Sequence, residues 1–174
     1  MEEKSFCYKY PHPALTTDCI IFGVDRNELR VLLIKRGSEP YKNLWAFPGG
    51  FLEISESAET GALRELKEET GLENVYIEQF HSFSDPDRDP RERVISIAFL
   101  SVVEICKVKA GDDAEEASWF PIDNLPHLAF DHQVMFDKAF SYLKERIYLF
   151  KTGFLIPNEN LNPKVLQTLY EIFK

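Results

Sequence analysis

Cysteine and long apolar runs are scarce in this chain of 174 residues, and basic residues are fewer than acidic ones. Its three cysteines (Cys7, Cys19 and Cys106) are odd in number and widely spaced, which excludes a disulfide framework and a cysteine-rich metal site. No segment reaches the roughly 20 apolar residues of a membrane span, and residues 1–13 do not contain the apolar centre of a signal peptide. We therefore predict a cytoplasmic protein with no membrane association.

Acidic residues outnumber basic ones, 29 to 20, and give a formal net charge of −9. Nucleic-acid binding draws much of its affinity from basic groups that neutralise phosphates, so we do not expect this chain to bind nucleic acid directly. The acidic excess favours solubility and also suits a site that holds cations. Apolar residues make up 44% of the chain, enough for the core of one globular domain with a small appendage.

Short apolar runs alternate with helical segments, a pattern typical of a layered α/β (α+β) domain. The best helix has Ser55 or Ser57 as its N-terminal cap and Gly71 as the left-handed residue that ends it. The run Pro48-Gly49-Gly50 is expected to stop a short strand. Strands are expected at residues 14–24, 29–35, 45–47, 75–83, 94–104 and 117–121, and helices at 57–70, at 130–150 and from Asn162-Pro163 onward.

The first of these helices carries a cluster of carboxylates. At about 100° per residue, Glu65, Glu68 and Glu69 fall within an arc of roughly 100°, beside a mostly apolar stripe. Like charges at this spacing repel one another, and a divalent cation with a preference for oxygen ligands would relieve the repulsion. A solvated acidic helix face would have the same pattern, so the helix alone leaves both interpretations open.

A longer motif surrounds the helix and separates the two interpretations. Gly50 is followed after five residues by Glu56, and after seven more by the run Arg64-Glu65-Leu66-Lys67-Glu68-Glu69-Thr70-Gly71-Leu72. This segment is similar to the Nudix box, with a matching residue at every position that the motif specifies. The odds of such a match arising by chance somewhere in the chain are on the order of 1 in 10⁷. The chain thus resembles the Nudix hydrolase superfamily, in the branch of ADP-ribose pyrophosphatases and Nudix-related transcriptional regulators, over roughly residues 10–150.

The resemblance implies the Nudix fold, an α/β/α sandwich with a mixed central β-sheet, for residues 1–150. Residues 151–174 would form a C-terminal extension with a short helix, which resembles the start of a winged-helix appendage that is truncated or absent. An apolar stripe on that helix must dock on the domain or on a second chain, because it cannot remain in water. The stripe consists of Val165, Leu166, Leu169, Ile172 and Phe173. Many proteins of this superfamily are dimers, and we expect a homodimer.

The same resemblance assigns roles to the motif. Glu65, Glu68 and Glu69 would ligate Mg²⁺ or Mn²⁺ with help from the carbonyl of Gly50 or its neighbour Gly49. Arg64 would orient these carboxylates as part of the catalytic group. The first candidate for the general base is Glu69. The remaining expectations are support of the loop by Glu53 and Glu56, and Glu115 or Glu116 as a more distant base.

Substrate contacts are expected outside the motif. Arginine suits phosphate and ribose oxygens, which makes Arg36, Arg88, Arg91 and Arg93 candidates. An aromatic ring, Phe83 or Phe47, is a candidate for stacking on a base, with core packing as the alternative for both. His132 is interpreted as a capping or packing residue. One departure weakens the substrate assignment, because Pro86 and Pro90 straddle the position where many ADP-ribose enzymes have a proline.

The expected function is metal-dependent hydrolysis of a diphosphate bond in a nucleoside diphosphate derivative. The resemblance implies ADP-ribose as the substrate, with AMP and ribose 5-phosphate as the products. The first alternative is a ligand-sensing domain of a regulator of sugar or NAD metabolism, which binds its ligand without turning it over. The second is an interaction protein that only keeps the fold. The intact motif from Gly50 to Leu72 favours the enzyme.

Overall fold

The computed structural model describes residues 8–25, 28–111, 114–152 and 162–174, so Cys7 lies outside the described residues. The strands are β1 (Ala14–Asp25), β2 (Glu28–Arg36), β3 (Trp45–Ala46), β4 (Gly49–Phe51), β5 (Glu78–Phe83), β6 (Val94–Glu104) and β7 (Ala114–Pro121). The helices are α1 (Ala58–Thr70), α2 (His132–Thr152) and α3 (Pro163–Ile172). None of the helices in these residues is both long and apolar enough to cross a membrane.

All seven strands belong to one mixed sheet. Its main order is β3-β2-β1-β6-β5, while β4 pairs with β1 and β7 pairs with β2. The central pair, β1 and β6, is parallel from Ala14↔Val94 onward, and the other pairs are antiparallel. The middle of β1 is almost entirely buried, as expected for a strand covered on both faces.

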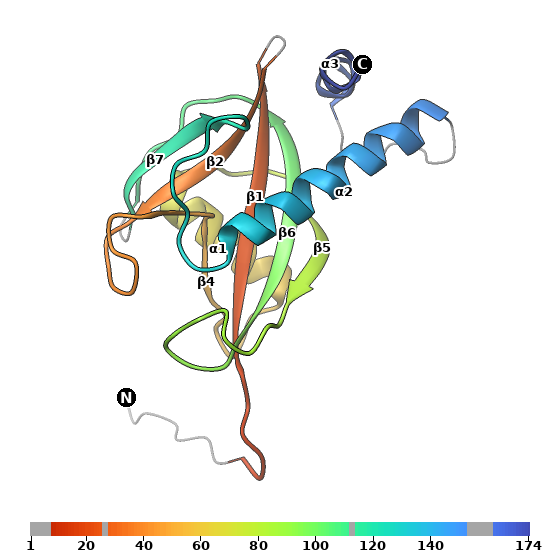
Figure 1. Ribbon diagram of the computed structural model, residues 1–174. Helices are drawn as coiled ribbons and strands as arrows, with labels where there is room; N and C mark the ends of the chain where they lie inside the picture. The colour runs from red at the N-terminus through yellow and green to blue at the C-terminus, as the bar shows by residue number, and fades with distance from the viewer. Residues whose placement is uncertain (1–7, 26–27, 112–113, 153–161) are drawn as a thin grey trace.

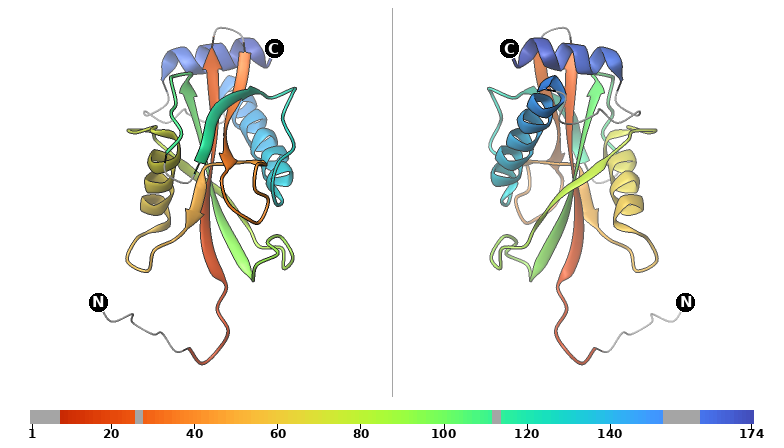
Figure 2. Two further views of the ribbon diagram at one scale, coloured as in Figure 1. Left: turned by 90° about the vertical axis from the view of Figure 1, so that its left-hand side faces the viewer. Right: turned by 90° about the vertical axis from the view of Figure 1, so that its right-hand side faces the viewer.

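Helices cover both faces of the sheet. Figure 2 shows the sheet nearly edge-on, with α1 on one side and α2 on the other. Successive residues of β1 point to opposite faces, so Cys19 and Ile21 pack with Leu66 of α1, whereas Ile20 and Phe22 belong to the core under α2. The predicted α/β/α sandwich with a mixed sheet is therefore confirmed (Figure 1).

Helix α1 begins and ends where the sequence predicts. The hydroxyl of Ser57 caps it by accepting a hydrogen bond from the Thr60 amide at 3.2 Å. Gly71 ends it in the left-handed conformation, with φ of 70°. The helix is also tied to the sheet, because the thiol of Cys19 donates a hydrogen bond to the carbonyl of Ala62. This anchoring fixes the carboxylate face of α1 beside β4.

Several predicted boundaries differ from the structure, because of strand pairing, a side-chain contact or the local backbone. The short strand ends at Ala46, before Pro48, but Gly49 and Gly50 then begin a second strand, β4, which pairs with β1. Strand β5 begins at Glu78 rather than at residue 75, since the carbonyl of Tyr76 accepts a hydrogen bond from the Ser101 hydroxyl instead of pairing with a strand. Strand β7 begins three residues early, at Ala114, which pairs with Arg36 across a bulge. Helix α2 begins at residue 132 rather than 130 because Phe130 has a left-handed φ of 51°.

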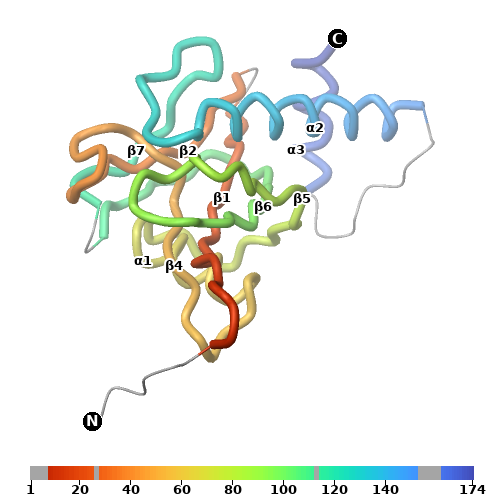
Figure 3. The backbone as a smooth tube through the Cα atoms, turned by 60° about the horizontal axis from the view of Figure 1, so that its bottom comes forward, coloured from red at the N-terminus to blue at the C-terminus, as the bar shows by residue number. Residues whose placement is uncertain are grey.

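Helix α3 docks on the same chain. Val165 and Leu169 are almost fully buried, in the core that α2 covers. The ammonium group of Lys151, in α2, donates to the carbonyls of Tyr170 and Phe173. Figure 3 shows α3 at a steep angle to α2, and Figure 2 shows it lying across one end of the sheet. Of the two predicted docking partners for the apolar stripe, the structure shows the domain itself.

Candidate active site

The carboxylate of Glu69 is buried where α1 meets β4. Its Oε2 accepts a hydrogen bond of 2.8 Å from the backbone amide of Gly49. The pKa of Glu69 is raised to about 8, chiefly by burial and to a smaller extent by nearby Glu65 and Asp18, against the lowering effect of the Gly49 amide. A carboxylate in such a position favours the binding of a cation or a proton.

Arg64 connects the acidic residues around the helix. Its guanidinium donates to Glu56 at 2.7 and 3.1 Å, to Glu65 at 2.8 Å and to Glu68 at 3.0 Å. It also reaches the carbonyl of Phe51 in β4, at 3.3 Å. One cation therefore holds three carboxylates in place and offsets their mutual repulsion. This geometry accounts for an arginine directly before Glu65.

Gly50 leaves room for the carboxylate of Glu65. A Cβ atom at position 50 would lie 2.5 Å from Oε1 of Glu65, which is closer than side chains approach. The backbone of β4 and the helix carboxylates therefore meet without an intervening side chain. The pKa of Glu65 is raised, mainly because the carboxylate is partly buried, and the hydrogen bond from Arg64 opposes this shift.

These residues fit a divalent metal ion by their chemistry. The donors are carboxylate and carbonyl oxygens, the ligands that Mg²⁺ and Mn²⁺ prefer. Among the described residues no three acidic, histidine or cysteine side chains converge into a ready cluster. The carboxylates do not converge because each has another partner. Arg64 donates hydrogen bonds to Glu65 and Glu68, and the Gly49 amide donates one to Glu69. A bound ion would share these carboxylates with Arg64.

A pocket of about 90 Å³ lies beyond β4, on the α2 side of the sheet. Gly49 and Gly50 line it too, so the same short strand borders the helix carboxylates and the pocket. Its other walls come from β1, β2 and β3, from the loop between β5 and β6, and from the segment that leads into α2. The lining residues are Thr16, Asp18, Ile34, Arg36, Ala46, Phe47, Gly49, Gly50, Phe51, Arg88, Asp89, Arg91, Phe130 and His132.

Three of the four predicted arginines meet in this pocket. Arg88 is buried and forms a two-point ion pair with Asp131, at 2.7 and 3.0 Å. Arg91 forms the same kind of pair with Asp89, also at 2.7 and 3.0 Å. Arg36 has no carboxylate partner among the described residues and donates to backbone carbonyls.

The two remaining predicted substrate residues lie elsewhere. Arg93 is exposed and donates to the carbonyl of Ser84, outside the pocket lining. Phe83 packs in the core under α2, where its ring contacts those of Phe80 and His81. Phe47, the alternative stacking ring, is buried and lies parallel to the ring of His132 at 5.3 Å, in the pocket wall.

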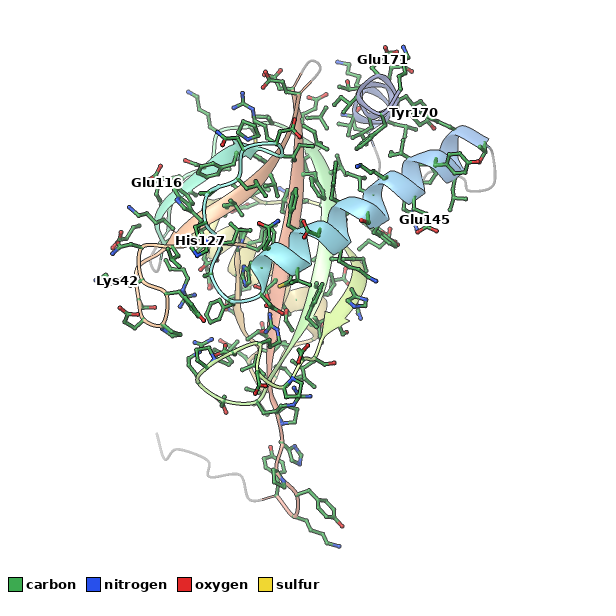
Figure 4. The ribbon with its side chains drawn as sticks, viewed as in Figure 1. Lys42, Glu116, His127, Glu145, Tyr170 and Glu171 are labelled. Atoms are coloured by element: carbon green, nitrogen blue, oxygen red, sulfur yellow. The ribbon has the colours of Figure 1, made fainter. Side chains whose placement is uncertain are left out.

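The candidates for a distant general base lie on β7. Glu115 and Glu116 are both exposed, and neither lines the pocket. Glu115 pairs loosely with Lys35 at 4.0 Å, and Glu116 accepts a hydrogen bond from Ser118. Figure 4 shows Glu116 on the outer side of the sheet.

Sequence reasoning missed several residues of the pocket wall, among them Thr16, Asp18, Phe51 and Phe130. Thr16 and Asp18 are polar residues directly before the buried, mostly apolar residues 19–24 of β1, and that contrast was the available signal. Phe51 and Phe130 gave no such signal, because they meet only after β4 pairs with β1 and the chain turns into α2.

Comparisons with known proteins agree with this architecture. The family model of the NUDIX domain matches residues 12–139. An ADP-ribose pyrophosphatase from Methanocaldococcus jannaschii is 48% identical over 124 residues, 71% of each chain. The ADPR responsive transcriptional repressor NtrR from Acinetobacter baylyi is 32% identical over 170 residues, or 94% of this chain and 67% of the repressor.

A solved structure extends the similarity to three dimensions. The crystal structure of a MutT/nudix family protein from Enterococcus faecalis aligns with a TM-score of 0.78 and 34% identity, over 95% of this chain and 70% of that one. Sequence and fold thus agree from β1 to α2, across the sheet and the glutamates of α1. The chain is therefore a member of the Nudix family of hydrolases.

Proposed function

We propose that this protein hydrolyses the diphosphate bond of ADP-ribose, giving AMP and ribose 5-phosphate, with Mg²⁺ or Mn²⁺ as its cofactor. The observation that carries the proposal is the position of Glu69. Its buried carboxylate is held by the amide of Gly49, on the strand that also lines the pocket. The 48% identity to an ADP-ribose pyrophosphatase supports the choice of substrate.

The residues of this chain have distinct roles in the proposed reaction. Glu65, Glu68, Glu69 and the carbonyl of Gly50 would hold the metal, and Arg64 would keep the carboxylates in position. A bound ion of this kind supplies charge neutralisation at the diphosphate and a more acidic water molecule. Glu69 accepts the proton of the attacking water, because its Oε2 is engaged by Gly49 and its Oε1 has no such partner.

The first test compares two glutamates of the same helix. Purified protein is incubated with ADP-ribose and Mg²⁺ or Mn²⁺, and released AMP is measured. Glu69→Gln should lower kcat by about 10²–10⁴-fold, since it removes a proton acceptor and a metal ligand together. Glu59→Gln changes an exposed carboxylate outside the site and should keep wild-type turnover. Chelation should abolish turnover, and full activity of Glu69→Gln would contradict the assignment.

A second candidate function is ligand sensing. The similarity to the ADPR responsive repressor covers 94% of this chain, including α3. A sensor would bind ADP-ribose tightly and release no AMP. Calorimetric binding and turnover, measured on the same preparation, separate the two functions.

The proposal also covers the surroundings of the enzyme. We place it in the cytoplasm as a homodimer that does not bind nucleic acid directly, with residues 151–174 as an extension of the domain. The net charge of −9 supports the absence of direct nucleic-acid binding. Sedimentation velocity at several concentrations tests the dimer, and titration with a labelled duplex at low salt tests nucleic-acid binding.

A further inference from the structure

The hydroxyl of Thr17, in β1, is buried without a hydrogen-bond partner. The residue is 1% exposed, and its Oγ1 contacts no donor or acceptor among the described residues. Buried polar groups almost always have a partner, because the water that they lose on burial has to be replaced. An unpaired hydroxyl beside a functional site is therefore a candidate for a contact that forms when the site is occupied.

Thr17 lies on the face of the sheet that α1 covers. Side chains alternate along a strand, so Thr17 points the same way as Cys19, two residues later. The thiol of Cys19 donates to the carbonyl of Ala62 in α1, which places this face directly beneath the helix. Thr16 and Asp18 point the other way and line the pocket on the α2 side.

Gly50 is the residue directly opposite Thr17 in the pairing of β1 with β4. Opposed residues of an antiparallel pair point to the same face, with Cβ positions about 4.5–5.5 Å apart. The carboxylate of Glu65 reaches the Cβ position of residue 50, with Oε1 at 2.5 Å and Oε2 at 2.9 Å from it. This carboxylate therefore fills the place next to Thr17 that a side chain at position 50 would otherwise take.

The other neighbours of Thr17 on this face do not compete for its hydroxyl. Ile97, its partner in β6, is apolar and packs in the core under α1. Cys19 directs its thiol at the Ala62 carbonyl. Of Ile97, Cys19 and Glu65, only Glu65 carries a strong acceptor.

Glu65 has one oxygen without a donor. Its Oε1 accepts a hydrogen bond of 2.8 Å from Arg64, and no donor among the described residues reaches Oε2. Arg64 also serves Glu56 and Glu68, so a cation that drew Glu65 away from Arg64 would leave this carboxylate without a donor. Carboxylates that ligate metal ions are commonly hydrogen-bonded as well, which fixes their orientation.

We propose that the hydroxyl of Thr17 is the donor that orients Glu65 when Glu65 ligates the metal ion. Thr17 is then a positioning residue, which acts on the ion only through Glu65. The hydroxyl gives up no other hydrogen bond to make this contact, because it has none in the structure. The inference rests on the proposed function, which includes Mg²⁺ or Mn²⁺ as the cofactor.

Binding of Mn²⁺, followed by the electron paramagnetic resonance signal of the free ion, tests the inference without any measurement of turnover. Thr17→Val removes the hydroxyl at nearly constant shape and should weaken Mn²⁺ binding by about 10- to 100-fold. Thr17→Ser keeps the hydroxyl and should restore binding. Thr17→Ala also removes the hydroxyl, and it provides a second variant if Thr17→Val does not fold.

Thr16→Val is the matched control. It removes another buried, unpaired hydroxyl from the adjacent position of β1, on the face away from α1. The Mn²⁺ affinity of this variant should equal that of the wild type.

Urea unfolding with and without Mn²⁺ separates the orientation of Glu65 from packing. Without the metal, Thr17→Val should be at least as stable as the wild type, because it replaces an unpaired buried hydroxyl by a methyl group of the same shape. Saturating Mn²⁺ should raise the unfolding midpoint of the wild type, since it binds the folded state, and should raise that of Thr17→Val less. A residue that only packs would instead lower both midpoints by a similar amount.

Several results would overturn the inference. They are an unchanged Mn²⁺ affinity in Thr17→Val, an equal loss of affinity in Thr16→Val, and a failure of Thr17→Ser to restore binding. Turnover of ADP-ribose, measured on the same preparations, keeps this result apart from the proposed function. Mn²⁺ binding that depends on Thr17, in a protein that does not hydrolyse ADP-ribose, would support the role of Thr17 and reject only the proposed hydrolysis.

Discussion

A single imidazole, that of His132, joins the pocket wall to the start of α2. Its Nδ1 accepts a hydrogen bond of 2.9 Å from the backbone amide of Phe47. The neutral ring therefore carries its proton on Nε2, which faces Oδ1 of Asp18 at 3.6 Å. Protonation of Nδ1 would place two donors against each other and break the contact with Phe47.

The pH dependence of stability follows from this contact. Burial lowers the pKa of His132 below its ordinary 6.5, and Asp18 opposes that effect. Below pH 6.5 the unfolded chain binds a proton that the folded protein does not. The stabilisation is therefore complete above pH 6.5 and is lost as the pH falls toward the lowered pKa.

Urea unfolding at pH 7.5, 6.5 and 5.5 measures this loss. His132→Gln cannot gain the proton and should flatten the decrease, because glutamine is neutral at every pH. His127, exposed in the segment before α2 (Figure 4), is the matched control, and His127→Gln should retain the wild-type slope. An unchanged slope in His132→Gln would reject the attribution.

Gly50 supports a second prediction at this scale, about the metal. A methyl group at position 50 would collide with the carboxylate of Glu65 and displace it. Gly50→Ala should therefore weaken Mn²⁺ binding by about 10- to 100-fold, as changes beside metal ligands commonly do. Ser55→Ala, at an exposed position of the following loop, should leave Mn²⁺ binding unchanged. Titration calorimetry measures both variants, and equal affinities would refute the prediction.

At the scale of secondary structure, α1 depends on its two caps. Gly71 has open space around its missing Cβ, with only the Lys109 carbonyl at 3.9 Å. Its φ of 70° is thus the sole obstacle to a side chain there. Gly71→Ala should lower the free energy of unfolding by about 1–2 kcal/mol, the cost of a left-handed residue with a Cβ.

Denaturant titration checks the cap prediction, with Glu59→Ala on the same helix as a neutral control. Since the carboxylates lie at least two residues before the cap, kcat of Gly71→Ala should remain close to wild type while α1 is folded. A loss of activity without a loss of stability would contradict this account.

The helix α1 was predictable because its signals are local. A capping serine, the spacing of the glutamates and a terminal glycine all lie within one segment. Strand β4 was not predictable, since Gly49 and Gly50 have turn propensities and become a strand only through pairing with β1. The start of α2 depends likewise on the unusual backbone of Phe130.

Some residues of the candidate site were likewise predictable from the sequence, and others were not. The carboxylates and Arg64 were predicted from one motif, and the structure places them together at β4. The pocket wall combines β1, β2, β3, β4 and two loops, so its members share no sequence pattern. The prediction of phosphate-gripping arginines did not include the pairing of Arg88 with Asp131, 43 residues away.

For the whole molecule, α3 determines whether the C-terminal extension is part of one cooperative unit. Leu169 is completely buried against the domain, and Phe173 contacts Phe140 of α2 with ring centres 5.9 Å apart. Glu171 lies on the outer side of the helix (Figure 4). The helix thus closes one end of the core under α2.

Leu169→Ala should lower the free energy of unfolding by about 2–5 kcal/mol, as cavities in a core do. Lys164→Ala, on the exposed side of α3, should have little effect. If α3 and the domain unfold together, one transition is observed whose midpoint does not change with protein concentration. A midpoint that rises with concentration would instead show that a second chain contributes to the stability of α3.

During translation, β1 is synthesised well before β6, its parallel partner in the sheet. Each residue of β1 pairs with a residue of β6 made about 80 positions later, which at roughly 5–20 residues per second means a delay of about 4–16 seconds. During that interval β2 and β4 can pair with one edge of β1, but the edge that later pairs with β6 has no partner strand. Chaperone capture of ribosome-bound chains that end before residue 94, and release of those that extend past 104, is the expected behaviour of this topology.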